Sequence, residues 1–396
     1  MILSKIIYIS PRSMRKNRAD AVHIMYSCAA FANNGIEVQL LTPLIRRKEY
    51  KIKKNEIFSL YDVPENFAIK ELPPQINDVA TNDNGVVRAW KRLQKFFSHL
   101  YFFLTNFSIF SSSGTILYSK CFISTMPYIL LKKVKLHKIP IVFELPIYEN
   151  KLSHKIIAAN SDFLIGKPIF KDNLINRLKD RQNKLIIPSA RFQTDYLKQR
   201  QIICKQSVRK KNGIGVHDKC IVYGGKTGPN SVRLVNFVKI ATKLPEFKFL
   251  VIGANEAAKV FLENFKIPNL LVFSFQPYQQ FIELIGMGDI LIGNYEDNSY
   301  NRYFLIPGKS GPYLASGIPV IFSDLPSLRE RFSEEIIYFA KPENIEDWVE
   351  KIHEIIDHPE KANRKAQKAR EFVQSKTFTK SAESILKQLN DSLYQG

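Results

Sequence analysis

Short runs of aliphatic and β-branched residues alternate with stretches of helical periodicity along most of the chain. In the N-terminal half, the first two runs cover Lys5–Ser10 and Glu37–Pro43, and a helical stretch at Ala19–Asn33 separates them. Helices that connect parallel strands cover the faces of a sheet, so this alternation predicts an α/β fold with a parallel sheet. Four further strands are expected in this half: Thr115–Lys120, Pro140–Pro146, Lys155–Asn160 and Lys184–Ser189.

The same alternation restarts after a polar and basic segment. Lys205–Lys219 contains glycine and several cations, as is typical of a linker. Beyond it the pattern predicts five strands and two helices: Cys220–Lys226, Lys248–Asn255, Asn269–Phe275, Asp289–Tyr295, Ile318–Asp324, then Asn344–Asp357 and Pro359–Phe372. A chain of 396 residues exceeds what one hydrophobic core usually organises. We therefore expect two Rossmann-like domains, residues 1–205 and 206–375. The remaining residues, 376–396, should form a helix, and one arrangement we consider is that this helix packs against the N-terminal domain.

One segment of the N-terminal half has a different pattern. A helix over residues 88–110 would place three cations on one side and four apolar residues on another: Arg88, Arg92 and Lys95, and Trp90, Leu93, Phe97 and Leu104. A basic amphipathic helix of this kind can lie in a membrane interface. It can equally pack as an aromatic helix against the N-terminal domain, and the sequence leaves both readings open.

The overall composition restricts the class of protein. The chain has 58 Lys and Arg against 37 Asp and Glu, a formal net charge of +21, which favours nucleic acid, an acidic membrane surface or phosphate-bearing substrates as partners. It lacks an apolar run of about 18 residues and a secretory signal in residues 1–25, so we expect a cytoplasmic protein. Four widely spaced cysteines form no zinc pattern and should be reduced thiols: Cys28, Cys121, Cys204 and Cys220.

Two segments of the C-terminal half could bind phosphate. At the end of a predicted strand, Gly224 and Gly225 allow backbone amides to approach a ligand and Lys226 adds a cation. Either Asn230 or Ser231 could cap the next helix. In Ile306–Asp324 a lysine and a serine precede a short helix that ends at a glycine, and a buried strand follows. Each segment alone could be purely structural in an α/β protein. The first matches neither a Walker loop nor a dinucleotide fingerprint.

Taken together, the order and spacing of these segments resemble a known family. Residues 301–324, NRYFLIPGKSGPYLASGIPVIFSD, resemble the donor-site signature of retaining GT-B glycosyltransferases of the family 4-like (group 1) type. The matching positions are Asn301, Arg302, Tyr303, Pro307, Lys309, Tyr313–Ala315, Gly317, Pro319, Val320, Ser323 and Asp324. Residues 17–43, 142–146 and 275–292 resemble other parts of the same family.

The resemblance implies an α/β fold of GT-B architecture, with two Rossmann-like domains whose parallel sheets face each other across a cleft. It assigns the donor phosphates to seven residues: Gly224, Gly225, Lys226, Asn230, Lys309, Ser310 and Gly311. Six more are candidates for the donor sugar or base: Pro277, Tyr278, Glu296, Asp297, Arg302 and Tyr303. His23 and Glu144 are the catalytic candidates on the N-terminal side, although His23 could also be a packed helix residue.

Three positions depart from the family pattern. Relatives usually carry a ribose-binding glutamate at the position of Pro312, and many carry another at the position of Phe304. A histidine usually stands where this chain has Pro146. Either other groups such as Glu296, Asp297 or the backbone bind the ribose and the sugar, or the donor site has changed its function.

The resemblance implies a hexosyltransferase-like activity, in which a sugar moves from a nucleotide diphosphate sugar to an acceptor hydroxyl. The configuration at the anomeric carbon would be retained, and no metal or other cofactor would be required. We expect a glycan or lipid-linked acceptor, as in bacterial surface polysaccharide or glycolipid assembly. The site of action would be the cytoplasm, including the inner face of the plasma membrane with its anionic lipids.

Three other functions are considered. The first is a nucleotide-sugar-binding GT-B protein with weak or absent transferase activity, the second a sugar-nucleotide epimerase of the same shape. The third is a basic nucleic-acid-binding protein, which the sequence disfavours because it has no RRM, KH or helix-turn-helix pattern.

Overall fold

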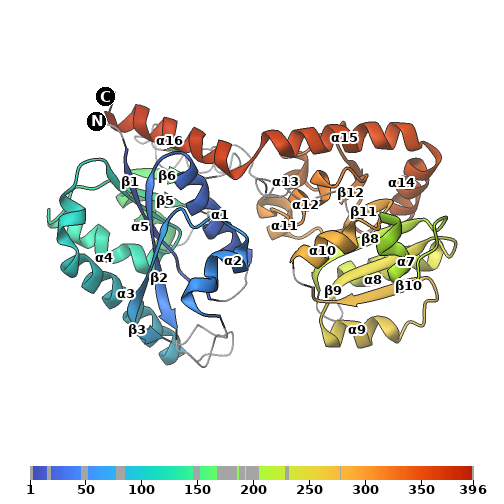
Figure 1. Cartoon of the computed structure of the whole chain (residues 1–396), viewed down its shortest axis with the longest axis horizontal. Coiled ribbons are helices and arrows are strands. Elements are labelled where there is room, and N and C mark those ends of the chain that lie inside the picture. The colour runs from blue at the N-terminus through green and yellow to red at the C-terminus, as the bar shows by residue number, and fades with distance from the viewer. Residues whose placement is uncertain are drawn as a thin grey trace. The chain divides into compact units, whose positions relative to one another are not determined.

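The computed structural model of the chain contains two compact units (Figure 1). It describes residues 3–15, 19–45, 52–76, 85–145, 152–166, 185–186, 192, 205–227, 232–276 and 278–394. The first unit comprises Met1–Arg191 together with Phe378–Gly396, and the second comprises Phe192–Thr377.

The first unit is built on a seven-stranded parallel sheet with the strand order β3-β2-β1-β4-β5-β6-β7. The strands are β1 (Lys5–Ile9), β2 (Glu37–Ile45), β3 (Ala68–Ile76), β4 (Thr115–Ser119), β5 (Ile141–Glu144), β6 (Phe163–Ile165) and β7 (Leu185–Ile186). The central strands β1 and β4 are almost entirely buried, as expected for a parallel sheet covered by helices on both faces. The order reverses between β1 and β4, which creates a crevice at their carboxyl ends.

Helices connect these strands. They are α1 (Ala19–Asn33), the short η2 (Lys54–Glu56) and α2 (Ile57–Tyr61), α3 (Gly85–Thr105), η3 (Phe107–Ser111), α4 (Phe122–Lys133) and α5 (Leu152–Asn160). The C-terminal helix α16 (Phe378–Tyr394) packs on α1 within this unit (Figure 1). The Asn34 side chain donates a hydrogen bond to the Thr379 carbonyl at 3.1 Å, and the Leu3 amide donates to Asn390 Oδ1 at 2.9 Å.

The second unit repeats this architecture with a six-stranded parallel sheet in the order β10-β9-β8-β11-β12-β13. The strands are β8 (Cys220–Thr227), β9 (Lys248–Ala254), β10 (Leu270–Ser274), β11 (Ile290–Gly293), β12 (Val320–Ser323) and β13 (Tyr338–Ala340). The helices are α7 (Lys205–Lys211), α8 (Val232–Lys243), α9 (Glu256–Glu263), α10 (Tyr278–Ile285), α11 (Ser299–Phe304), α12 (Ser310–Ala315), α13 (Pro326–Arg329), α14 (Ile345–Asp357) and α15 (Pro359–Ser375). Here the order reverses between β8 and β11, so the crevice lies at their carboxyl ends.

Two predicted elements are wrong. Lys155–Asn160 is the last part of helix α5 and not a strand, and the strand of this region is β6. A short apolar run does not distinguish a buried helix from a strand, and the two alanines in this run favour the helix.

The predicted linker at Lys205–Lys219 is the second error, because its first half forms helix α7. Lys205 and Arg209 are four residues apart and therefore lie on the same side of the helix. Both pair with Asp289 at the start of β11, at 2.8 Å and 2.7 Å. The cations that suggested a linker thus fix the helix to the sheet.

Candidate functional site

Two adjacent glycines form the carboxyl end of β8 in the second unit. A Cβ atom on Gly224 would lie 2.6 Å from the Phe281 ring, so only glycine fits there. Gly225 has a φ of +139°, a backbone conformation that residues with a side chain rarely adopt. The pairing of β8 with β9 is irregular at this point. Irregular backbone next to glycine brings main-chain groups close to the carboxyl edge of the sheet, where ligands bind in open α/β sheets.

Tyr313 on α12 holds this glycine turn in place. Its buried hydroxyl accepts a hydrogen bond from the Gly224 amide at 2.6 Å and lies 3.4 Å from the carbonyls of Gly224 and Ile292. The side chain therefore joins α12 to the ends of β8 and β11, the two strands at which the sheet order reverses.

The side-chain amine of Lys309 lies next to the glycine turn. Its Nζ atom is 3.8 Å from the ring centroid of Tyr223, and the rings of Tyr295 and Tyr313 are 5.2 Å and 5.6 Å away. A Cβ atom on Gly225 would lie 3.8 Å from the same nitrogen. Among the described residues Nζ has no hydrogen-bond partner. Burial, and to a lesser degree the charge of Arg233, hold the pKa of Lys309 well below its usual value.

A second cation, Arg233, stands beside Lys309, and the sequence analysis did not include it. It belongs to the first turn of α8. Its guanidinium lies 5.8 Å from the Tyr295 ring centroid, and its charge partly offsets the effect of burial, which raises the pKa of Tyr223. Its carbonyl accepts a hydrogen bond from Asn294 Nδ2 at 2.6 Å. Only the proximity of Arg233 to the glycine turn in the sequence could have suggested this role.

The carboxyl edge of β8 and β11 contains several buried polar atoms without a partner among the described residues. They are Thr227 Oγ1 at the end of β8, Asn294 Oδ1 directly after β11, and Lys309 Nζ. No ion pair in the described part of the chain joins Arg233 or Lys309 to a carboxylate. Buried polar atoms normally have hydrogen-bond partners, and here the amine and the hydroxyl can donate to an anion while the amide oxygen can accept from a hydroxyl, so the cluster fits a ligand that carries both groups.

The other predicted phosphate-binding residues lie at or next to this edge, or outside the described residues. Ser310 is buried, and both its amide and its hydroxyl donate to the Pro307 carbonyl, at 3.1 Å and 2.6 Å. Gly311 follows it in the first turn of α12. Lys226 continues β8, but its side chain is outside the described part, as is Asn230.

The residues predicted for the sugar or base lie mostly after β11. Asp297 pairs with Arg302 at 2.8 Å, and the Glu296 carbonyl accepts a hydrogen bond from the Asn301 side chain at 2.9 Å. Tyr303 on α11 is exposed. Pro277 lies outside the described residues, and of Tyr278 only the backbone, at the start of α10, is described.

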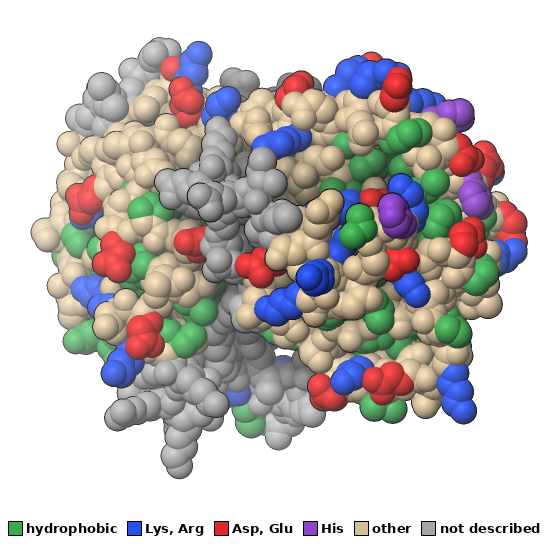
Figure 2. Space-filling view, turned by 45° about the vertical axis from the view of Figure 1, so that its right-hand side comes forward, with side chains coloured by type: hydrophobic (Ala, Val, Ile, Leu, Met, Phe, Trp, Pro, Cys, Tyr) green, Lys and Arg blue, Asp and Glu red, His purple; other side chains and the backbone are tan. Residues whose placement is uncertain are grey.

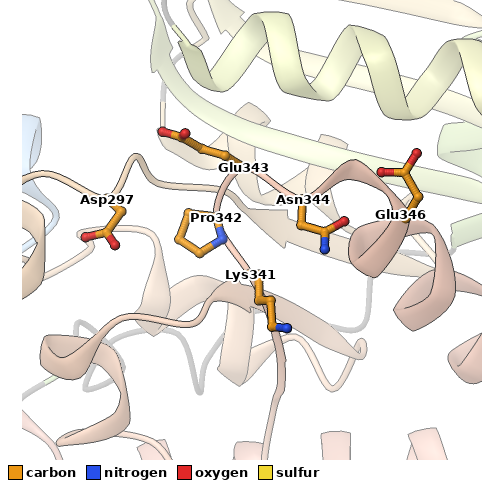
Figure 3. Close-up of a pocket in the computed structure, with 6 residues that line it drawn as sticks. All are labelled: Asp297, Lys341, Pro342, Glu343, Asn344 and Glu346. Atoms are coloured by element: carbon orange, nitrogen blue, oxygen red, sulfur yellow. The ribbon is translucent and has the colours of Figure 1, made fainter.

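Asp297 also borders a hollow of about 560 Å³ in the second unit (Figure 3). The opposite wall is the loop after β13 and the start of α14, and its lining residues are Lys341, Pro342, Glu343, Asn344 and Glu346. Figure 3 shows Asp297 on one loop and Lys341–Asn344 on another, with the hollow between them. Carboxylates and an amide at such a rim can bind hydroxyl groups.

The two catalytic candidates of the first unit are joined by a residue that the sequence analysis missed. Lys120, directly after β4, has its Nζ 2.7 Å from Nδ1 of His23 on α1 and 3.0 Å from Oε1 of Glu144 at the end of β5. The Tyr118 hydroxyl donates to the other Glu144 oxygen at 2.5 Å. Because a lysine ammonium only donates hydrogen bonds, Nδ1 of His23 is the acceptor and the proton of the neutral ring lies on Nε2. The cluster lies where the strand order of this sheet reverses.

Comparison with family models finds a match over part of the chain. Residues 233–387 match the family model described as "Glycosyl transferase-like". This region includes Arg233, Lys309 and the hollow at Asp297. No curated protein matches the chain in sequence at a significant level.

Solved structures resemble the whole chain in fold. A glycosyltransferase from Rickettsia africae has a TM-score of 0.70 at 14% identity, covering 99% of both chains. A sucrose-phosphate synthase from Thermosynechococcus elongatus has a TM-score of 0.71 at 13% identity, again over 99% of both chains. The Anabaena protein HepE, solved in complex with UDP and glucose, has a TM-score of 0.65 at 10% identity over 99% of this chain and 100% of its own. The predicted α/β fold of two parallel sheets, as in GT-B glycosyltransferases, is therefore confirmed.

Proposed function

We propose that the protein is a glycosyltransferase that moves a sugar from a nucleoside diphosphate sugar to an acceptor hydroxyl. The observation that carries this proposal is the pair Arg233 and Lys309, two cations without a carboxylate partner in the described part of the chain, beside a glycine turn at the carboxyl edge of the sheet. The glycosyl transferase-like match over 233–387 and the fold shared with a protein that binds UDP and glucose support it.

In this proposal Arg233 and Lys309 stabilise the leaving group. Cleavage of the bond between the anomeric carbon and the phosphate oxygen releases a nucleoside diphosphate, on which negative charge accumulates in the transition state. The guanidinium of Arg233 can bind two phosphate oxygens at once. The amine of Lys309 can donate hydrogen bonds to the same phosphates, and the negative charge of the bound diphosphate would favour its protonated form. The cations of the chain would supply this stabilisation without a metal.

Carboxylates after β11 and β13 are our candidates for binding the ribose hydroxyls. The usual glutamate is replaced by Pro312, which is buried in α12 and has no hydrogen-bonding side chain. Asp297 and Glu343 border the hollow of Figure 3 and can accept hydrogen bonds from hydroxyl groups. We propose that the ribose lies against this rim.

The cluster in the first unit would act on the sugar or the acceptor. With Lys120 donating to Nδ1, the proton of the neutral His23 ring lies on Nε2, so a hydroxyl group that approached this nitrogen would meet a donor and not an acceptor. Glu144 is bound by both Lys120 and Tyr118, so we assign it a positioning role and not that of a nucleophile. Lys120 is likewise a positioning residue. Transfer with retention of configuration, and a glycan or lipid-linked acceptor from surface polysaccharide or glycolipid assembly, complete the proposal.

Incubation of the purified protein with a panel of nucleoside diphosphate sugars tests this function. We expect release of the nucleoside diphosphate, slow in water and faster with a glycan or lipid-linked acceptor, and a glycosylated product. Binding without turnover would favour a sugar-nucleotide-binding protein. Conversion of the sugar nucleotide into an isomer without an acceptor would favour an epimerase. Either result would contradict the transferase.

A further inference from the structure

The side of helix α3 that faces solvent is apolar. Six residues form this surface, which we call the α3 stripe: Val86, Trp90, Leu93, Phe97, Tyr101 and Leu104. They are spaced by three or four residues, so they lie along one side of the helix. Their exposed fractions lie between 49% and 79%. A surface helix normally buries its apolar side, so this stripe is the reverse of the usual arrangement.

The opposite side of α3 is fixed to the protein and prevents the helix from turning its stripe inward. His99 Nδ1 lies 3.2 Å from the Tyr128 hydroxyl on α4, and Lys95 donates to the Pro11 carbonyl at 2.8 Å. Phe102 and Phe103 are almost fully buried. Rotation of the helix would expose these two rings, each of which contributes a large apolar area to the core. The stripe is therefore a constant feature of the folded unit.

The end of α4, a helix that packs against α3, carries a second group of exposed apolar residues with cations among them. Leu130, Val134 and Leu136 are exposed, and so are the lysines among them, Lys133, Lys135 and Lys138. Largely buried rings connect this segment to the end of α3 inside the unit. The ring centroids of Phe107 and Phe103 are 5.5 Å apart, and those of Phe103 and His137 are 5.7 Å apart. We call the α3 stripe and residues 130–138 together the α3/α4 surface.

The charge of the protein is concentrated in the unit that carries this surface. The first unit has 32 Lys and Arg against 16 Asp and Glu, a net charge of +16, whereas the second has 26 against 21, a net charge of +5. On the face shown in Figure 2, the basic and acidic side chains of the right-hand part are interspersed. The strongly basic unit attracts an anionic partner and repels a second copy of itself.

We propose that the α3/α4 surface docks on the anionic surface of a lipid bilayer. The apolar and aromatic side chains of the stripe would enter the boundary between headgroups and acyl chains, the region that tryptophan and tyrosine prefer. The lysines of residues 130–138 would lie near the lipid phosphates. Docking would be peripheral, since no helix in the described part of the chain is long and apolar enough to cross a membrane.

Tryptophan fluorescence measures docking directly. The chain has two tryptophans, Trp90 in the stripe and the fully buried Trp348, so any change on docking comes from Trp90. We expect a blue shift with vesicles that contain phosphatidylglycerol, a much weaker one with pure phosphatidylcholine, and none in Trp90→Phe.

A Leu93→Gln/Phe97→Gln/Leu104→Gln variant should bind anionic vesicles in sedimentation at least about tenfold more weakly. A Lys133→Glu/Lys135→Glu/Lys138→Glu variant should lose the preference for anionic lipid.

The matched control changes exposed apolar residues of the second unit, Val216→Gln/Val260→Gln/Phe265→Gln, and should bind vesicles like the wild type. Circular dichroism checks that each variant is folded, and the thermal shift produced by a nucleoside diphosphate sugar checks that its donor site is intact. A loss of docking can therefore be distinguished from a failure of the proposed function. Equal vesicle binding by the wild type and the stripe variant would overturn the proposal. So would a wild-type dimer that the stripe variant converts to monomers, since the stripe would then bind a second copy.

Discussion

At the scale of single residues, the most informative side chain is Lys309. The sequence places it at the start of a short helix, and the family resemblance assigns it to the donor phosphates. The structure instead encloses its amine among Tyr223, Tyr295 and Tyr313 beneath the glycine turn. The sequence could not indicate this enclosure, because the three rings come from β8, the segment after β11, and α12.

Replacing Lys309 with methionine should separate stability from binding. Methionine has a similar length and removes the buried, unpaired amine, so we expect the free energy of unfolding without ligand to rise by about 1 kcal/mol. The affinity for the nucleoside diphosphate sugar should fall at least about tenfold, or ~1.4 kcal/mol. Chemical denaturation and calorimetric titration measure the two effects. A destabilised variant with unchanged affinity would mean that Lys309 is a structural residue only.

The pH dependence of stability gives a second test of the buried amine. In the unfolded chain the pKa of Lys309 is near the ordinary lysine value of about 10.4, and in the folded protein burial lowers it. Between these two pKa values the unfolded state holds the extra proton, so the free energy of unfolding should rise with pH across this window. Lys309→Met should lack that rise. Parallel stability-versus-pH curves for the two proteins would contradict a lowered pKa.

Lys120 is the residue whose role the sequence left unrecognised, because its partners lie about 100 and about 25 positions away. Lys120→Met removes the donor to His23 Nδ1, so the imidazole proton is no longer confined to Nε2. We expect kcat to fall about 100-fold, with a displaced pH profile and little change in the KM for the donor, and Lys120→Arg should restore part of the activity. Lys132→Met removes a similar ion pair, with Asp162, and is the control. Equal losses in the two methionine variants would exclude a specific role for Lys120.

At the scale of secondary-structure elements, the sequence predicts the strands with long aliphatic runs, such as β4, β8 and β9. It misses β3 and β13, because Ala68–Ile76 contains charged residues and two prolines and Tyr338–Ala340 is very short. The strand predicted at Lys155–Asn160 is wrong for a local reason, because a short apolar run fits a helix as well as a strand, whereas the linker predicted over α7 is wrong for a tertiary reason. Helix α7 exists because Lys205 and Arg209 reach Asp289, a contact between residues about 80 positions apart.

The carboxylate of Asp289 therefore determines how α7 packs. Burial alone would raise the pKa of Asp289, but hydrogen bonds from Lys205, the Cys220 amide and Arg209 lower it overall. Its stabilising effect is present above the unfolded pKa of about 3.9 and is lost as the pH falls towards the folded value. Asp289→Asn should lower the free energy of unfolding by about 3 kcal/mol at neutral pH, because buried Arg209 loses its counter-ion.

Urea denaturation of Asp289→Asn and of Asp218→Asn, at a half-buried residue, provides the comparison. Asp218 accepts a hydrogen bond from the Gly215 amide at the surface, and its substitution should cost below about 1 kcal/mol. Similar losses in both variants would show that α7 does not depend on Asp289.

The glycine turn at the end of β8 depends on its backbone conformation. Gly225→Ala should cost about 1–2 kcal/mol of stability, because alanine is strained at a φ of +139°. It should also weaken donor binding, since the turn lies directly above Lys309. Gly308→Ala is the matched control: it has open space around it and no positive φ, so it should change stability by less than about 0.5 kcal/mol. Two alanine variants that behave alike in thermal unfolding and donor titration would contradict this role of the turn.

At the scale of the whole molecule, the chain contains two parallel sheets of the same design, in units that differ in net charge. In each, the candidate site residues collect where the strand order reverses, at β1 and β4 in one unit and at β8 and β11 in the other. The alternating pattern of the sequence predicts this architecture well. The partners within each site are not predictable in the same way, because they are set by which loops meet at the carboxyl edge.

The central claim is that Lys309 and Arg233 bind the diphosphate of a nucleotide sugar. The most direct measurement is the shift in Tm that a panel of nucleoside diphosphate sugars produces in the wild type, Lys309→Met and Arg233→Gln. We predict that at least one sugar nucleotide raises the Tm of the wild type and that both variants lose most of this shift while remaining folded. A panel that leaves the wild type unchanged, or that stabilises all three proteins equally, would contradict the claim.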